Sequence, residues 1–490
     1  MEQNNNEQEE IVKPAGRYLR FKPFAFLMML FFVVLATAGL TIFALTFGEE
    51  KVVEVKVPVE RAEFEKVYDA FDALKKDYYV EVEDNTLIEG AVNGMLDSLE
   101  DPYTDYMTVK EAGDFNESLS SSFQGIGAEV QDRNGQIMIV TPIKNSPAEK
   151  AGLLPHDIIL SVDGENIEGK TTSEAVALIR GEKGTEVTLM IKRGDGAPIE
   201  VKIKRDDIPI ETVYGEMLED GIAHVQITSF SEKTAEELQA VLDSFTDMKG
   251  IVLDMRQNPG GYLDQAMLMA SLFVEEGKPI YQIQLRNQKP EIFYAQGGKK
   301  YDVPVTVLID KGSASASEIV AAALQESAGA KVIGEQSFGK GTMQTVHQFQ
   351  VKNKKDGSEM KYTQGKWLTP LGNWINEKGI KPDVAVNMPT YASLPYVSPS
   401  VEMKEGMVSE QVKAVQEMLT VLGYEAGKID GSFDEELTQV VKQFQVDQKL
   451  EQTGVITGDT TLAIMEQLRE KIKTDDPQLK RAAEEAKSAK

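Results

Sequence analysis

The sequence predicts a multidomain α/β chain, in which a central α/β body follows helices and a small β-module and precedes a helical module. Between residues 206 and 388, apolar strand-like runs alternate with helical segments, a pattern typical of an α/β domain. Between 122 and 205, shorter runs alternate apolar and polar residues and are separated by glycine-containing turns, which indicates a separate β-module. The length of 490 residues accommodates about two to four domains.

The composition excludes several classes of protein. Cysteine is absent, so disulfides and thiolate metal sites are impossible. The sequence contains three histidines and no HExxH motif, which argues against a zinc protease and leaves no expected metal site. A net charge of −27 argues against a nucleic-acid partner, because phosphate binding needs a basic surface.

The N-terminus has the features of a membrane anchor. Residues 1–23 are polar and basic near their end, residues 24–47 contain no charge, and Glu49 and Glu50 follow. An uncharged run of 24 residues can cross about 30 Å of hydrocarbon, and the flanking charges place the N-terminus inside. We expect a cytoplasmic tail at 1–23, a transmembrane anchor at 24–47 and an extracytoplasmic remainder. The ATA at 36–38 leaves signal-peptidase cleavage open, although the apolar run continues beyond it.

Helices and then strands precede the central body. Apolar residues at helical spacing predict an N-terminal helical region at 55–118. Within 122–205, four alternating runs predict strands, and two short segments predict helices between them.

The chemistry is expected in the segment from residue 312 to residue 344. An apolar strand at 305–310 enters the turn GSASAS, which opens a helix, and a glycine-rich loop carrying Lys340 follows. A serine is inert as a nucleophile until a base takes its proton. A lysine can act as that base only if burial lowers its pKa.

Each of these motifs alone has a simpler interpretation. A serine-rich turn before a helix can be an N-cap, and a GKG loop can carry a solvated lysine. Residues 334–340 also fit the GxxxxGK pattern of a phosphate-binding loop. That pattern requires Ser or Thr next, to hold magnesium, whereas this chain has Gly341.

Together, GSASASEI and FGKGTMQ resemble the carboxyl-terminal processing proteases, also called tail-specific proteases. The α/β body would then be a catalytic core of the processing-protease type, and RQNPGGYL would match the family's oxyanion loop. The resemblance implies Ser315 as nucleophile, Lys340 as general base, Gln344 as the residue that orients the lysine, and the N–H groups of Gly261 and Ala316 as the oxyanion hole. It implies no cofactor, and it leaves the role of Glu326 open.

Residues 122–205 resemble a PDZ domain, the alternative being an unrelated structural β-module. PDZ domains add a peptide strand to a sheet edge and hold its C-terminal carboxylate with backbone N–H groups. The resemblance implies a carboxylate-binding loop and protein substrates with apolar C-termini. The loop would consist of Gly125, Ile126, Gly127 and Ala128. Arg180 matches a family arginine that can couple peptide binding to the active site, and a solvated arginine at a helix end is the equal alternative.

The C-terminal part resembles a three-helix peptidoglycan-binding module at 405–471, preceded by a linker at 389–404. An unrelated three-helix bundle is the alternative, and some such modules bind protein pro-segments instead. Peptidoglycan is the expected partner. The charged, alanine-rich tail at 472–490 is expected to be disordered or a frayed helix.

These observations predict a membrane-anchored, extracytoplasmic serine endopeptidase that recognises protein C-termini through its PDZ domain and cleaves with a Ser–Lys dyad. The N-terminal helical region is expected to allow a homodimer. A non-catalytic, wall-tethered PDZ scaffold is the alternative, and a murein hydrolase lacks the expected Cys–His or metal groups.

Overall fold

The computed structural model describes residues 22–133, 135–351 and 354–488 except 48–61, and it describes only the backbone of residues 40–47, 351 and 354. The expected cytoplasmic tail therefore lies almost entirely outside the described residues. The chain divides into two compact units, 1–87 and 88–490. The N-terminal elements are α1 (Pro23–Phe47), a 3₁₀ turn (Ala62–Phe64), α2 (Glu65–Asp77) and α3 (Asp84–Asp97). Among the described residues, no helix meets the length and hydropathy needed to cross a membrane.

The PDZ-like module forms two sheets. One has the order β3-β4-β5-β7-β8 with β6 paired to β5, and the other joins β2 to β9. Its elements are β2 (Ser122–Gly125), β3 (Ala128–Arg133), β4 (Gln136–Pro142), α5 (Pro147–Lys150), β5 (Ile158–Val162), β6 (Glu165–Asn166), α6 (Thr172–Ile179), β7 (Glu186–Lys192), β8 (Ile199–Lys204) and β9 (Asp206–Pro209). Buried isoleucine, leucine and valine side chains from both the strands and the helices fill one core.

The central α/β body is built on a six-stranded sheet of order β10-β11-β12-β15-β16-β19. Its strands are β10 (Val213–Met217), β11 (Ile222–Ile227), β12 (Gly250–Asp254), β15 (Val305–Ile309), β16 (Lys331–Gly334) and β19 (Val384–Ala385), with a 3₁₀ turn at Glu219–Gly221. The pairs from β11 to β19 are parallel, and β10 is antiparallel. The connecting helices are α7 (Thr234–Ser244), α8 (Leu263–Ser271) and α9 (Ala316–Ala323), which a π-helical turn (Leu324–Ala328) extends.

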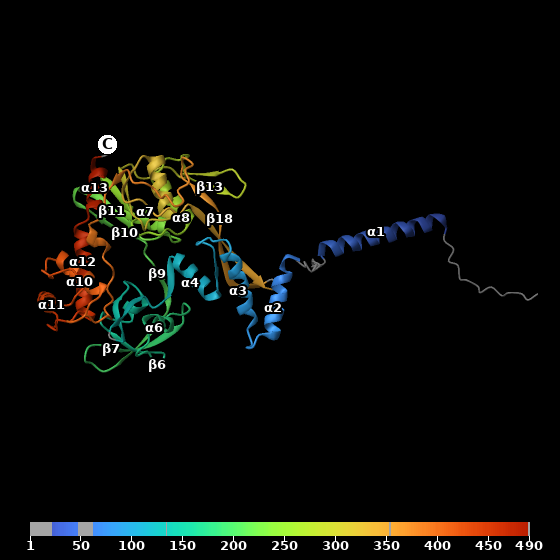
Figure 1. The fold of residues 1–490 in the computed structure, drawn as a ribbon. Coiled ribbons are helices and arrows are strands. Elements are labelled where there is room, and N and C mark those ends of the chain that lie inside the picture. The colour runs from blue at the N-terminus through green and yellow to red at the C-terminus, as the bar shows by residue number, and fades with distance from the viewer. Residues whose placement is uncertain (1–21, 48–61, 134, 352–353, 489–490) are drawn as a thin grey trace, which may run out of the picture. The chain divides into compact units, whose positions relative to one another are not determined.

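Both faces of this sheet are covered. Because successive strand residues point to opposite faces, Ile251 and Leu253 pack in the core with α7, α8 and α9, whereas Val252 packs on the other side. The C-terminal helix α13 (Pro477–Ser488) covers that other side with buried Ala482 and Ala486. Figure 1 shows α13 running beside β11.

The second sheet carries a long hairpin. Its order is β1-β18-β13-β14, with β17 paired to β18. The elements are β1 (Asp105–Met107), α4 (Val109–Leu119), β13 (Pro279–Leu285), β14 (Glu291–Tyr294), β17 (Thr342–Val351) and β18 (Lys354–Leu368). Because β17 begins at Thr342, the hairpin starts directly after Lys340 and Gly341 and fixes the end of their loop.

The C-terminal module contains α10 (Glu410–Val421), α11 (Glu435–Asp447) and α12 (Gly458–Thr474) around its own core. The expected linker contains a 3₁₀ turn (Thr390–Ser393), and its Val397 and Met403 are buried in that core. The expectation of a disordered or frayed tail was wrong. Helix α13 is ordered because its alanines allow close approach to the six-stranded sheet.

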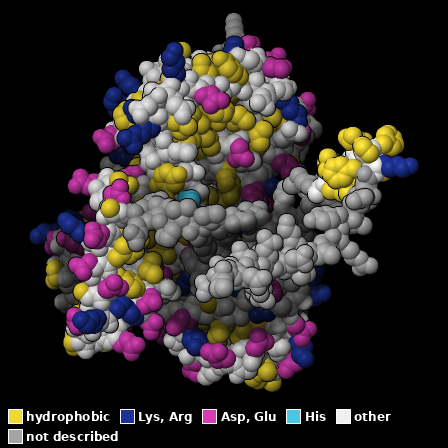
Figure 2. Space-filling model, turned by 90° about the vertical axis from the view of Figure 1, so that its right-hand side faces the viewer, with side chains coloured by type: hydrophobic (Ala, Val, Ile, Leu, Met, Phe, Trp, Pro, Cys, Tyr) yellow, Lys and Arg dark blue, Asp and Glu magenta, His cyan; other side chains and the backbone are white. Residues whose placement is uncertain are grey.

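The face shown in Figure 2 carries acidic side chains spread among basic ones and hydrophobic patches. A phosphate-binding surface needs a continuous basic field. The described part of this face does not present one.

Candidate active site

Ser315 lies where the turn after β15 meets α9. The turn holds it at φ 55° and ψ −113°. A residue other than glycine at positive φ is strained, and such strain is found preferentially at functional sites. The side chain is half-buried in front of the first turn of α9, whose leading N–H groups have no intrahelical partner. This position suits a nucleophile that attacks a carbonyl group.

The two neighbouring serines of the motif are part of the packing. The Ser313 hydroxyl donates to the Met255 carbonyl at 2.8 Å, and the Ser317 hydroxyl donates to the Asn258 carbonyl at 2.9 Å. Both side chains are fully buried. Ser315 is therefore the serine of the three whose hydroxyl donates to no other residue in the described structure.

Asn258 locks the loop after β12 to the catalytic turn. Its side-chain oxygen accepts from Gly260 N at 2.9 Å, and its amide nitrogen donates to the Ile227 carbonyl at 2.8 Å. Its own carbonyl accepts from Ala314 N at 3.0 Å as well as from the Ser317 hydroxyl. One buried residue, through its side chain and its backbone carbonyl together, thus connects the two loops that contribute the expected catalytic groups.

Gly260 and Gly261 bring the backbone of this loop against the nucleophile. At φ 103°, a Cβ on Gly260 would lie 2.9 Å from the Ser315 Cβ, and at φ 148°, one on Gly261 would overlap the Phe230 carbonyl. Only glycine fits at both positions. The N–H groups of Gly261 and Ala316 donate to no group within the described residues, so both are available to a substrate oxygen.

Lys340 lies in a half-buried position with its ammonium 4.9 Å from the centre of the Tyr103 ring. Burial lowers the pKa of Lys340 below its usual 10.5, and the positive charge of Lys361 lowers it further, whereas Glu318 and Asp101 oppose the shift. In the described part of the chain its ammonium forms no ion pair. A lowered pKa increases the fraction of neutral amine, which is the form that can accept a proton.

Glu318 connects the nucleophile turn to the lysine loop. This residue was not among the predicted site residues. Its carboxylate is buried and accepts four hydrogen bonds, from Ser337 Oγ at 2.6 Å and from the backbone N–H groups of Gly339, Ser315 and Lys340 at 2.7, 2.8 and 2.9 Å. Burial raises the pKa of Glu318, and the four hydrogen bonds only partly offset that effect. The signal in the sequence was the spacing S-x-x-E, which is typical of a capping box.

The dyad is not closed in this structure. No hydrogen bond joins Ser315 Oγ to Lys340 Nζ in the described residues. Gln344, expected to orient the lysine, instead donates its amide to the hydroxyls of Thr342 and Thr363, each at 3.0 Å. Its expected role therefore stays a prediction.

Glu326 lies at the surface, where it accepts from the backbone N–H of Leu371 at 2.8 Å. This contact holds the segment after β18. In the described structure, the Glu326 carboxylate bonds to neither Ser315 nor Lys340. Across the described residues, no group of three or more histidine, aspartate or glutamate side chains could hold a metal ion.

The expected carboxylate-binding loop of the PDZ-like module is preformed. Its carbonyls are engaged, since Ile126 accepts from Ala148 N at 2.8 Å and Gly127 accepts from Ile143 N at 2.9 Å. The N–H groups of Ile126 and Gly127 donate to no described residue, and successive free N–H groups of this kind bind carboxylates.

Arg180 follows α6 and lies beside this loop. Its guanidinium pairs with Glu117 at 2.5 Å and stacks 4.8 Å from the centre of the Phe123 ring. The structure thus connects Arg180 to α4 and to the strand that leads into the loop.

A strained serine at a helix start, free N–H donors beside it and a half-buried lysine define a serine hydrolase. Comparison with known proteins places the chain within that class. Residues 221–386 match the model of peptidase family S41, 138–193 match a PDZ domain, 408–465 match a peptidoglycan binding domain, and 44–111 match the activating protease CtpB N-terminal domain.

Known relatives match almost the whole chain. The carboxy-terminal processing protease CtpA of Bacillus subtilis is 45% identical over 466 residues, which is 94% of this chain and 98% of that protein. A probable CtpA-like serine protease of Staphylococcus aureus is 38% identical, with 96% and 94% covered. The solved photosystem II D1 C-terminal processing protease is 26% identical, with 66% and 88% covered and a TM-score of 0.39. The chain belongs to the carboxy-terminal processing serine proteases of peptidase family S41. This membership confirms the protease, the PDZ domain and the peptidoglycan-binding domain, and it disfavours the non-catalytic scaffold.

Proposed function

We propose that this protease is anchored in the membrane, faces the extracytoplasmic side, binds proteins with apolar C-termini and cleaves them with Ser315 and Lys340. The observation that carries the catalytic part is the half-buried Lys340 held beside the Ser315 turn through Glu318. The free N–H groups of Ile126 and Gly127 support the capture of a C-terminal carboxylate.

In the acylation step, neutral Lys340 takes the Ser315 hydroxyl proton while the oxygen bonds to the scissile carbonyl carbon. The carbonyl oxygen becomes an oxyanion, and Gly261 N–H and Ala316 N–H donate to it. Each donor is worth about 3 kcal/mol in the transition state. Lys340 then gives its proton to the leaving amine, the C–N bond breaks, and an ester remains on Ser315.

In the deacylation step, Lys340 takes a proton from water as the water oxygen attacks the ester carbon. The same two N–H groups hold the second oxyanion. Collapse releases the new C-terminus, and the proton returns to Ser315. Because the two side chains are not hydrogen-bonded at rest, binding of substrate must bring Lys340 to Ser315 before the first step.

The location is proposed from the sequence. Residues 24–47 are uncharged, basic residues precede them and acidic residues follow, which supports an anchor with the protease outside. The peptidoglycan-binding domain supports docking of the anchored protease on the wall. Alkaline washing of membranes tests the anchor, and co-sedimentation of the purified chain with peptidoglycan tests the docking.

The direct test of the function is mass spectrometry of the peptides shed by wild-type cells and by cells carrying Ser315→Ala. We expect C-terminal fragments with apolar ends that disappear in the variant. Identical peptide pools would contradict the proposed proteolysis, and fragments ending in charged residues would contradict the proposed specificity.

A further inference from the structure

Helix α13 belongs to the C-terminal tail, yet it is packed as part of the protease. Ala482 and Ala486 are fully buried against the sheet face opposite α9, and the Ala482 carbonyl accepts from the Thr306 hydroxyl of β15 at 3.1 Å. An ion pair between Lys487 and Asp220, at 2.7 Å, holds its far end. The helix therefore connects the wall-binding domain to the protease sheet.

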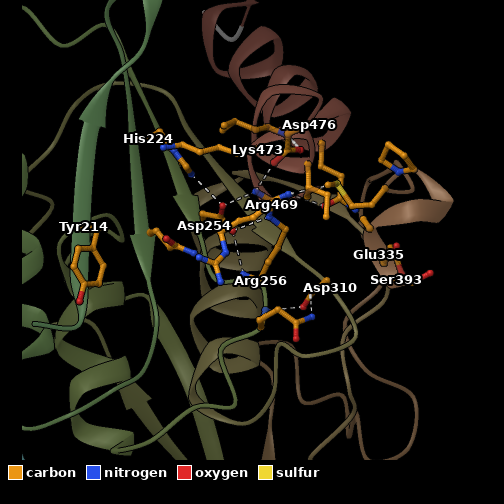
Figure 3. A pocket seen from close by; sticks show the side chains of 18 of the residues that line it. Tyr214, His224, Asp254, Arg256, Asp310, Glu335, Ser393, Arg469, Lys473 and Asp476 are labelled. Carbon is orange, nitrogen blue, oxygen red and sulfur yellow. Dashed lines mark hydrogen bonds and ion pairs between the residues drawn. The ribbon is translucent and has the colours of Figure 1, made fainter. Parts of the chain in front are cut away.

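The start of α13 holds one residue of the protease, Arg256. Asp476 pairs with the guanidinium at 2.8 Å, and the Gln478 side-chain oxygen accepts from it at 3.0 Å. Gln478 is fully buried, and its amide donates to the Val386 carbonyl at 2.8 Å. Figure 3 shows Asp476 and Arg256 among the residues that line a cavity of the protein.

Arg256 is also bound to the end of β12. Its guanidinium donates to both oxygens of Asp254, at 2.9 and 2.6 Å, and Asp254 is only 2% exposed. His224 hydrogen-bonds the same carboxylate at 3.0 Å. A cavity of about 1210 Å³ lies beside these groups, and Arg256 is among the residues that line it. Besides Asp254, the guanidinium contacts Met388 Sδ at 3.7 Å and the two residues at the start of α13.

Arg256 stands at the base of the loop that carries the oxyanion donor. Asn258 follows it by two residues and ties Gly260 to the catalytic turn. Between them, Gln257 has φ 57° and donates from its backbone to Asp310, which immediately precedes that turn, at 2.9 Å. A displacement of Arg256 would therefore reach Gly261 through a short, strained segment.

We propose that α13 is a positioning element for catalysis, in which Asp476 and Gln478 hold Arg256 and thereby fix the loop that carries Gly261. The inference rests on the proposed oxyanion role of Gly261. On this proposal the C-terminal tail contributes to catalysis. Helix α13 also links the peptidoglycan-binding domain to the active site.

The test variant is Asp476→Asn in the full chain. Asp476 also caps α13 by accepting from Leu479 N at 2.8 Å, and asparagine caps a helix as well as aspartate does. The substitution therefore preserves the helix start and removes the charge that pairs with Arg256. We expect kcat to fall roughly 10-fold with KM unchanged, because a small displacement of a catalytic group costs rate and not binding. The labelling rate with a fluorophosphonate, whose tetrahedral adduct uses the same oxyanion donors, falls in parallel.

The controls separate positioning from folding. Asp476→Glu keeps the charge and restores most of kcat, and Lys487→Ala, which removes the ion pair at the far end of α13, leaves kcat and labelling unchanged. Gln478→Ala removes the second contact from α13 to Arg256 and should also lower kcat. Its thermal midpoint shows whether the fold is preserved. If Asp476→Asn keeps wild-type kcat while Ser315→Ala is inactive, the positioning role is wrong and the proposed function stands. If Ser315→Ala stays active, the proposed function itself fails.

Discussion

Replacing Glu318 by glutamine removes a buried charge that holds the active site together. One carboxylate oxygen accepts from the Ser337 hydroxyl and Gly339 N–H, and the other accepts from Ser315 N–H and Lys340 N–H. Glutamine has the same shape but presents one oxygen and one NH₂ group. One pair of donors therefore loses its acceptor, whichever way the amide turns.

The free energy that the substitution costs can be estimated from the less unfavourable orientation of the glutamine amide. With the NH₂ group toward Ser337, the hydroxyl can rotate and accept from it, but the Gly339 N–H loses its acceptor and the Ser337 hydroxyl proton must find another one. An unsatisfied buried donor costs about 1–3 kcal/mol. Because about 1.4 kcal/mol corresponds to a factor of ten in rate, kcat should fall by roughly 10- to 100-fold if the strain moves the Lys340 loop.

The assay measures kcat and KM on a protein with an apolar C-terminus, together with the thermal midpoint. We expect Glu318→Gln to lose kcat, to keep KM, because the four donors to this carboxylate all lie in the catalytic body and not in the PDZ domain, and to unfold cooperatively. Glu318→Ala, which leaves all four donors without an acceptor, should lose more activity and also stability. Wild-type kcat in Glu318→Gln would refute the view that this carboxylate aligns the dyad.

Three further outcomes follow from the site. Ser313→Ala should remain active and lose about 1–3 kcal/mol of stability, because its buried hydroxyl donates to the Met255 carbonyl and accepts from Asp310 N–H and so has a packing role; an inactive, folded variant would contradict this. Proteolysis should rise with pH as Lys340 deprotonates, with an apparent pKa below 10.5, since burial lowers its pKa; a rate that falls across that range would oppose a lysine base. Arg180→Ala should retain peptide affinity at the PDZ domain but lose activation of reporter cleavage by a C-terminal peptide, because its pairing with Glu117 connects the loop to α4; unchanged activation would remove Arg180 from control.

The catalytic serine and the glycine loop could be predicted because their geometry is local. A turn of small residues before a helix and two glycines after a strand define their backbone conformations within a few residues. The surroundings of Lys340 could not be predicted in the same way. Phe338, two residues before Lys340, is 55% exposed, and the ring beside the ammonium belongs to Tyr103, far away in the sequence.

The packing of the C-terminal tail could not be predicted from the sequence either. Its alanines and charged residues give little apolar signal, so α13 resembles a solvated segment in the sequence. Small side chains pack closely only when a flat apolar surface is supplied, and here that surface is formed by Val252, Leu308 and Ile333 of the protease sheet. Glu318 could not be predicted for a similar reason. A capping glutamate accepts further hydrogen bonds from the lysine loop only when that loop folds over it.

The most direct test of the central claim is peptide mapping of the purified chain after reaction with a fluorophosphonate. We expect one adduct, on Ser315, that is absent in Ser315→Ala and forms much more slowly in Lys340→Ala, while both variants unfold like the wild type. An adduct on another residue, or proteolysis that persists in Ser315→Ala, would contradict it.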